Sequence, residues 1–185
     1  MYNLTALHAK SKVFLLLRTK LERNIFVKII IGVSDMKMSN DIESTLITYS
    51  LGSCIGVSIY DPVVKAGGIL HYMLPESSID EVKAQNNPFM FADTGIPKLF
   101  KATYDLGAKK QRMKIVVAGG AQILDQKGFF NIGKRNHLAL RKIFFKNNVI
   151  INYEEVGGNC NRTVRLDIKT GDTYIKISGK GEIKV

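Results

Sequence analysis

The sequence has few of the residues that carry catalytic or cross-linking chemistry: no tryptophan, two cysteines and three histidines. Its longest apolar runs, such as residues 13–17 and 29–31, are far shorter than the roughly 20 residues that a membrane-spanning helix requires. The first run also lacks the cleavage pattern of a secretory signal, and two cysteines 106 positions apart do not indicate a disulfide framework. We therefore expect no membrane insertion and a reducing, cytoplasmic compartment.

Acidic residues are also scarce, since 16 of them stand against 27 lysines and arginines, which gives a formal net charge of +11. Residues 1–28 carry six basic groups and one acid, and a second basic stretch, from Lys127 to Lys146, contains no acid. This second stretch is typical of a solvated helix face or of a docking face for an anionic partner. A nucleic-acid-binding function rests on charge alone, because no known binding module is present, and we expect no nucleic acid as a partner.

A length of 185 residues with 45% apolar and 23% charged residues is typical of one globular domain with a substantial core. Residues 1–24 are basic and differ in character from the rest of the chain, so we expect them to form an N-terminal extension. The folded domain then spans residues 25–185.

Four segments in the first half are typical of β-strands, because β-branched residues are dense in them or alternate with other residues. They are residues 25–33, 45–50, 54–60 and 68–74. In the third segment, Ile55, Val57 and Ile59 lie on one face and Cys54 on the other. The cysteine is thus expected to point away from the apolar face.

A turn at residues 61–64 joins the third and fourth segments, because its Asp-Pro start suits a type I turn. If the turn has two central residues, Cys54 pairs with His71 across the hairpin, and directly opposed side chains have Cβ atoms about 5 Å apart. A bulge near residues 67–68 can shift this register by a residue or two. Such a shift leaves Cys54 and His71 close together.

The second half contains two amphipathic helices and further strand signals. We expect helices at residues 92–106 and 134–147, strands at 114–118 and 149–153, a C-terminal hairpin from 163–168 and 173–178, and an irregular segment at 86–91. Strands outnumber helices and are mostly joined by hairpins. This favours an α+β fold, a single domain of mixed β-sheets with flanking helices.

Cys54 and His71 are the candidate reactive pair. A cysteine beside an imidazole can form the thiolate that attacks an acyl carbon, and neighbouring main-chain N–H groups can hold the oxyanion. Taken singly, each residue fits a core position better, because free cysteines are usually buried fillers and His71 lies in an apolar strand. Cys160 has no histidine near it in the sequence, and we interpret it as incidental.

The remaining candidates point to no further chemistry. His8 lies in the N-terminal extension, and His137 lies in the basic helix, where a surface histidine is expected. The cysteines and histidines show none of the short spacings of zinc ligands, so we expect no metal and no cofactor. The glycine pair at 119–120 indicates a tight turn rather than a phosphate loop.

Five blocks of this sequence resemble one known family. Residues 48–57, TYSLGSCIGV, and residues 67–75, GGILHYMLP, are closely similar to the CheD family of chemoreceptor glutamine deamidases. The other blocks are FAD at 91–93, AGGAQ at 118–122 with NIGKRN at 131–136, and GGN at 157–159 with RTV at 162–164. The resemblance spans about residues 29–178.

The resemblance implies a cysteine hydrolase that converts selected receptor glutamine side chains to glutamate and releases ammonia. It places the nucleophile at Cys54, the histidine at His71 and an orienting threonine at Thr48. His71 is then expected to help form the thiolate, and the reaction to pass through a thioester. Without the resemblance, Thr48 is explained by the β-propensity of threonine alone.

The resemblance also implies a layered α/β arrangement similar to the catalytic domain of the cytotoxic necrotizing factor. It implies cytoplasmic chemoreceptor helices as the substrate and a CheC-type phosphatase as a partner, while residues 1–24 have no counterpart in it. The alternative function is a non-catalytic chemotaxis adaptor that binds receptors or the phosphatase.

Overall fold

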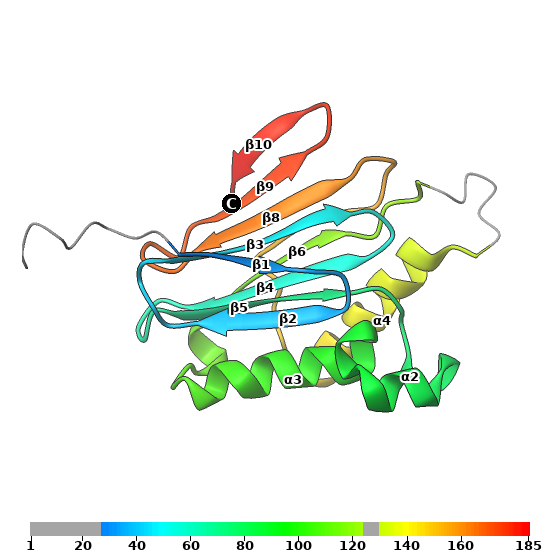
Figure 1. The fold of residues 1–185 in the computed structure, drawn as a ribbon, viewed down its shortest axis with the longest axis horizontal. Coiled ribbons are helices and arrows are strands. Elements are labelled where there is room, and N and C mark those ends of the chain that lie inside the picture. The colour runs from blue at the N-terminus through cyan, green and yellow to red at the C-terminus, as the bar shows by residue number, and fades with distance from the viewer. Residues whose placement is uncertain (1–26, 124–129) are drawn as a thin grey trace, which may run out of the picture.

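The computed structural model describes residues 27–123 and 130–185, and within them it contains two five-stranded β-sheets with helices on one side (Figure 1). The strands are β1 (Val27–Ile31), β2 (Asp35–Ser39), β3 (Ser44–Leu51), β4 (Ile55–Asp61), β5 (Ala66–Tyr72), β6 (Lys114–Gly119), β7 (Tyr153–Val156), β8 (Arg162–Asp167), β9 (Thr173–Ile177) and β10 (Gly181–Lys184). The α-helices are α2 (Glu81–Asn86), α3 (Ala92–Asp105) and α4 (Ile132–Lys146), with 3₁₀ turns at Ser77–Ile79, Pro88–Met90 and Lys110–Arg112. The α+β class predicted from the sequence is confirmed.

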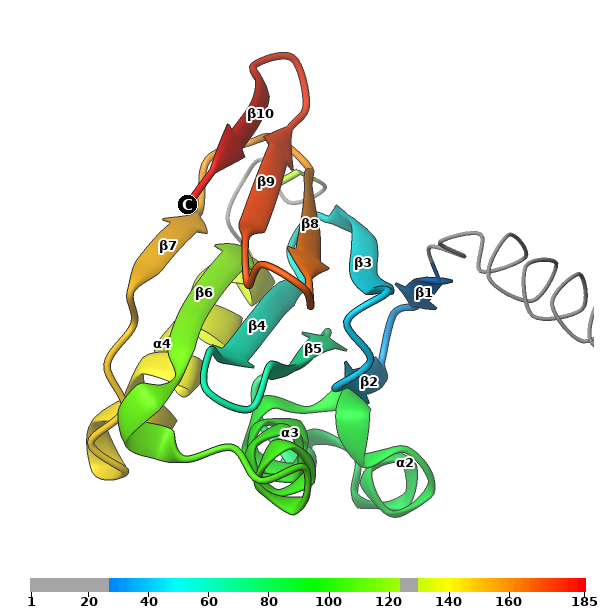
Figure 2. The same cartoon turned by 90° about the vertical axis from the view of Figure 1, so that its left-hand side faces the viewer.

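The domain has three layers. The first sheet has the strand order β1-β3-β8-β9-β10 and the second the order β2-β5-β4-β6-β7. Figures 1 and 2 show the second sheet between the first sheet and the helices. One apolar cluster, with Leu46 and Leu166, fills the space between the sheets, and another, with Leu99 and Phe144, fills the space between the second sheet and helices α3 and α4.

Strands β4 and β5 form the middle of this arrangement, and every residue in both is buried. Ile55, Val57 and Ile59 share the helix-side cluster, as the alternation predicted. The opposite face, expected to be the less apolar one, is also covered, because Tyr60 belongs to the cluster between the sheets. Cys54 packs against this cluster between the sheets. It therefore lies next to the end of a strand whose two faces are both buried.

The predicted hairpin between β4 and β5 is present, but its register differs from the prediction. Asp61 pairs with Ala66, so the loop has four residues rather than two, with Lys65 at a left-handed φ of 49°. His71 therefore pairs with Gly56, and the predicted Cys54–His71 pairing is wrong by two residues. The shift is even, so His71 stays on the face that the prediction gave it, and Cys54, one residue before β4, packs against the cluster between the sheets.

Other predictions are confirmed or corrected by the structure. Helices α3 and α4, strand β6 and the β8–β9 hairpin lie where the sequence predicted them. The strand predicted at 149–153 instead begins at Tyr153, because Val149 and Ile151 pack against the helix-side cluster from a connecting segment. The sequence analysis expected strands joined mostly by hairpins. Two pairs of neighbouring strands, β1–β3 and β6–β7, are instead parallel.

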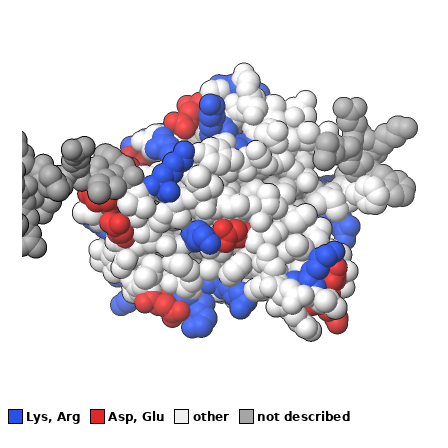
Figure 3. Space-filling view, viewed as in Figure 1, with Lys and Arg blue, Asp and Glu red and all other residues white. Residues whose placement is uncertain are grey.

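Charged side chains are interspersed on the face of the molecule seen in Figure 3, where lysine and arginine alternate with acidic residues and leave wide uncharged areas. The net positive charge is therefore not gathered into one stripe on this face. The predicted extension 1–24 and the start of the basic stretch at Lys127 lie outside the described residues. Among the helices that the structure describes, none has the length and apolar character needed to cross a bilayer.

Candidate active site

Thr48 and His71 form a hydrogen bond that joins the two sheets. Thr48 lies on β3 of the first sheet and His71 on β5 of the second, and neither side chain is exposed to solvent. Thr48 Oγ1 lies 2.8 Å from His71 Nδ1 and 2.9 Å from the main-chain oxygen of Ile31. Two of the three residues singled out in the sequence are therefore in direct contact.

The contacts of Thr48 determine which nitrogen of His71 carries the proton. The Ile31 carbonyl can only accept a hydrogen bond, so the hydroxyl proton of Thr48 is donated to it. Thr48 Oγ1 must then accept from His71, which places the imidazole proton on Nδ1. The lone pair on Nε2 is left free, and this buried atom has no hydrogen-bond partner among the described residues.

Burial keeps the imidazole of His71 neutral. It lowers the pKa of His71 from 6.5 to about 4, because the charged form loses its hydration in the space between the sheets. At neutral pH the ring is therefore uncharged, with an unprotonated Nε2 that is able to take a proton. This is the protonation state required of a general base.

Cys54 lies in the short segment that connects β3 to β4, and the main chain of this segment is held at three consecutive carbonyl groups. The carbonyl of Gly52 accepts from Ala121 N–H at 2.7 Å, and that of Cys54 accepts from Gly120 N–H at 2.8 Å. Between them, Ser53 O accepts from Asn136 Nδ2 at 2.9 Å. The backbone of the candidate nucleophile is thus fixed by the end of β6 and by α4.

Two glycines make this close packing possible. A Cβ added to Gly119, which has a φ of 114°, would lie 2.2 Å from the Cys54 carbonyl oxygen. A Cβ on Gly133, in the first turn of α4, would lie 2.3 Å from the carbonyl oxygen of Gly120. The interpretation of 119–120 as a tight turn is therefore incomplete, because the glycines also admit the backbone of Cys54 and the start of α4.

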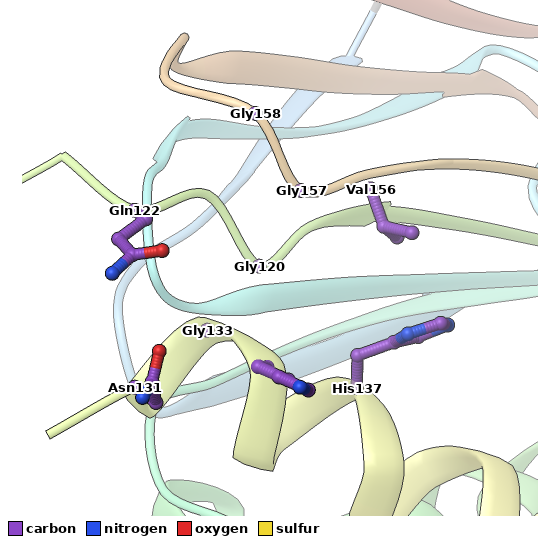
Figure 4. Close-up of a pocket in the computed structure, with 9 residues that line it drawn as sticks. Gly120, Gln122, Asn131, Gly133, His137, Val156, Gly157 and Gly158 are labelled. Atoms are coloured by element: carbon purple, nitrogen blue, oxygen red, sulfur yellow. The ribbon is translucent and has the colours of Figure 1, made fainter. Parts of the chain in front are cut away.

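A cavity of about 630 Å³ opens at Cys54, which is partly exposed in it. Its lining includes Ser53, Ile132 and Asn161, so the segment before β4, helix α4 and the segment before β8 all contribute. A smaller hollow of about 280 Å³ next to it shares Gln122 and Gly133 with this cavity (Figure 4). The Cys54 cavity is large enough to admit an extended polar side chain.

Burial also acts on Cys54, in the opposite direction to its effect on His71. It raises the pKa of the Cys54 thiol above 9.0, and a hydrogen bond from the residue's own backbone N–H offsets this only in part. The resting site at neutral pH thus holds a neutral thiol and a neutral imidazole. The thiolate is therefore not the resting form of Cys54 at neutral pH.

The neutral pair leads to a prediction about alkylation of the thiol. In a Cys160→Ala variant, the rate of Cys54 alkylation by iodoacetamide should rise with pH and continue to rise beyond pH 9.0, because only the thiolate reacts. The measurement is the rate constant from about pH 5 to about pH 10, followed by intact mass. A plateau already reached near neutral pH would instead mean a resting thiolate–imidazolium pair.

His137 and Cys160 lie outside this cluster, and His8 lies outside the described residues. His137 Nε2 contacts Glu154 Oε2 at 3.1 Å, as expected for a surface histidine. Cys160 is a free, partly exposed cysteine whose Sγ lies 3.5 Å from Asn159 Oδ1. Asn136, which contacts the Cys54 segment directly, was not singled out from the sequence, although it closes the NIGKRN block.

Comparison with known proteins gives consistent results. The family model described as CheD chemotactic sensory transduction matches residues 73–177, more than half of the chain. The chain is 60% identical over 151 residues to a probable chemoreceptor glutamine deamidase CheD 1 of Syntrophus aciditrophicus, covering 82% of this chain and 94% of that protein. It is 50% identical over 153 residues to a probable chemoreceptor glutamine deamidase CheD of Solibacter usitatus, covering 83% and 90%.

Among solved structures, a Neisseria meningitidis protein of family model DUF152 has a TM-score of 0.37 and 10% identity, covering 77% of this chain and 67% of that one. This likeness is too weak to support an inference, and the predicted similarity to the cytotoxic necrotizing factor stays a prediction. The family match begins at Met73, after all three candidate residues. With the matched model and relatives of this identity and coverage, the chain belongs to the CheD family.

Proposed function

We propose that this protein deamidates glutamine side chains of chemoreceptors, with Cys54 as nucleophile, His71 as general base and acid, and Thr48 as the residue that orients His71. Family membership supports the reaction and the substrate class. The observation that carries the assignment of residues is the Thr48–His71 hydrogen bond, which leaves a buried Nε2 without a partner among the described residues, on the residue that pairs with Gly56, two positions after Cys54.

In this proposal the first half-reaction forms a thioester. His71 Nε2 takes the thiol proton as Cys54 Sγ attacks the carboxamide carbon of the glutamine. Main-chain N–H groups beside Cys54 stabilise the oxyanion, as the sequence predicted. The C–N bond then breaks, and His71 gives its proton to the departing ammonia.

The second half-reaction hydrolyses the thioester. His71 takes a proton from a water molecule that attacks the thioester carbonyl, the C–S bond breaks, and the sulfur regains its proton. The products are glutamate and free enzyme, so each cycle consumes one water and releases one ammonia. The neutral resting pair suits this cycle, because His71 must accept a proton twice.

The test of this function is incubation of the purified protein with a cytoplasmic fragment of a chemoreceptor, followed by peptide mass spectrometry. The proposal predicts conversion of specific glutamines to glutamate, with an equal amount of ammonia released. Binding of the fragment without conversion would favour the adaptor alternative instead.

We also propose a CheC-type phosphatase as a partner and the cytoplasm as the place of action. The sequence resemblance implied the phosphatase, and a free thiol nucleophile suits a reducing compartment. Copurification of the phosphatase with the full chain tests the first point. A phosphatase that does not bind at micromolar concentration would contradict it.

Helix α4 is proposed to guide the receptor to the site. It carries five basic residues and no acid, and its first turn lines the Cys54 cavity. Substitution Lys134→Glu, in the hollow next to the Cys54 cavity, should raise KM several-fold with little change in kcat, because rim charges act on encounter with an anionic partner. The matched control is Lys176→Glu on β9 in the other sheet, which should leave KM unchanged; equal effects of the two variants would contradict a role for α4.

A further inference from the structure

Asn136 in α4 contacts both strand ends that carry the proposed catalytic pair. Its side chain is completely buried, and Nδ2 donates to Ser53 O and to Met73 O, each at 2.9 Å. Both partners are carbonyl oxygens, which only accept hydrogen bonds, so the amide cannot take the reversed orientation. The two protons of one NH₂ group are therefore used to connect the segment before Cys54 with the segment after His71.

This contact lies at the point where the β4–β5 ladder ends. The last pair of the ladder is Ile55 with Tyr72, and the main-chain N–H of Met73 already turns away to Met90 O at 3.0 Å. The next rung would have involved Cys54 and Met73. The Asn136 side chain thus connects the two chain segments at the point where the main-chain hydrogen bonds of the ladder end, directly before Cys54.

The main chain of Asn136 is held as well. Tyr72 Oη donates to the Asn136 carbonyl oxygen at 2.8 Å, and Tyr72 is completely buried. Gly133, one turn earlier, lies against Gly120, which itself donates to the Cys54 carbonyl. Movement of Asn136 relative to β4 and β5 is therefore restricted from both its side chain and its backbone.

We propose that Asn136 is a positioning residue, which fixes the Cys54 segment relative to the His71 strand and so limits the movement of Sγ relative to Nε2. This inference rests on the proposed function for the roles of Cys54 and His71. Asn136 itself does not line the cavity at Cys54 and touches no reacting atom. Small displacements of aligned groups lower rates by large factors, so loss of this restraint affects the chemical step more than substrate binding.

The first test compares Asn136→Ala and the isosteric Asn136→Asp with the natural protein. The alanine variant should lose about 10- to 100-fold in kcat with KM within about twofold, because only alignment is lost. The aspartate variant should lose more, because a carboxylate would face two carbonyl oxygens. In the alanine variant, Cys54 should also be alkylated faster by iodoacetamide. The reason is that the released segment is better hydrated, which favours the thiolate.

These opposite changes, slower deamidation and faster alkylation, separate positioning from a purely structural role. Variants that melt at a lower temperature but keep the natural kcat and the natural pH profile of Cys54 alkylation would overturn the inference. The alkylation readout needs no receptor. It therefore stays informative if the protein turns out not to deamidate receptors, a result that would be evident from the natural protein alone.

A second pair of variants covers the case in which the Asn136 variants do not fold. Tyr72→Phe and Tyr60→Phe each remove one buried hydroxyl group. Tyr60→Phe is the matched control, because the Tyr60 hydroxyl donates to Ile168 O at 3.0 Å near the other end of β4. Tyr72→Phe should lower kcat about 3- to 10-fold, and Tyr60→Phe less than about twofold. Equal effects of the two variants would contradict the inference.

Discussion

Replacing Cys54 with alanine is expected to abolish glutamine conversion in a chemoreceptor fragment, with a loss of at least about 10⁴-fold in kcat. The physical reason is that the variant keeps the cavity and the buried imidazole but has no atom that can form the thioester. The fixed main chain at 52–54 does not depend on the thiol, because its carbonyl groups bond to Asn136, Gly120 and Ala121. The fold should therefore persist, and receptor binding can be measured on the same variant.

Cys160→Ala is the matched control, since it removes the other free cysteine of the chain. It should convert glutamines at the natural rate, as judged by peptide mass spectrometry under identical conditions. Conversion that persists in the Cys54 variant and disappears in the Cys160 variant would move the nucleophile to the loop before β8. A biological effect that survives in the Cys54 variant would favour the adaptor alternative.

Thr48→Val is expected to lower kcat by about 100-fold or more while leaving receptor binding unchanged. Valine has nearly the shape of threonine, so the packing between the sheets is kept while the hydroxyl is lost. The Nδ1–H group of His71 then has no acceptor in a buried site. The imidazole is free to turn or to move its proton to Nε2, and in that tautomer it cannot take the thiol proton.

Thr48→Ser is the control for this prediction, because it keeps a hydroxyl that can accept from His71 and donate to Ile31 O. It should retain activity within about tenfold, and kcat and KM should be measured for both variants. Equal losses in the serine and valine variants would indicate that the threonine methyl group, and not its hydroxyl, matters at this position.

Local sequence patterns were enough to predict much of the fold around the site. Strand alternation placed Ile55, Val57 and Ile59 on one apolar face of β4, and the turn composition placed β5 beside it. The register failed because the loop holds four residues, with Lys65 in a left-handed conformation that the Asp-Pro start does not reveal. Since the error was even, it did not turn His71 to the other face of the sheet.

The segments that escaped prediction share weak apolar patterning. Strand β10 is fully exposed, β2 is only partly buried, and α2 buries no residue. Such elements are stabilised by edge pairing and capping, as when Asp80 accepts from Lys83 N–H at the start of α2. Edge pairing and capping do not require a periodic pattern of apolar residues. The sequence predictions relied on that pattern, so they missed these elements.

The role proposed for Thr48 could not come from its residue type, because a threonine in a strand needs no special explanation. It became specific only through the resemblance, and its hydrogen bond to His71 crosses from one sheet to the other. The contacts of Asn136 could not be predicted from local sequence patterns either, because its partners Ser53 and Met73 lie 83 and 63 positions away. Contacts of this range depend on the tertiary fold.

The most direct test of the proposed chemistry is deamidation in the presence of hydroxylamine. A thioester on Cys54 reacts with hydroxylamine as well as with water, so the target glutamines should be converted partly to the γ-hydroxamate, in a share that rises with hydroxylamine concentration. Peptide mass spectrometry distinguishes this product from glutamate at each position, and the Cys54→Ala variant should form neither. Glutamate as the sole product of the active enzyme at every hydroxylamine concentration would contradict a thioester on Cys54.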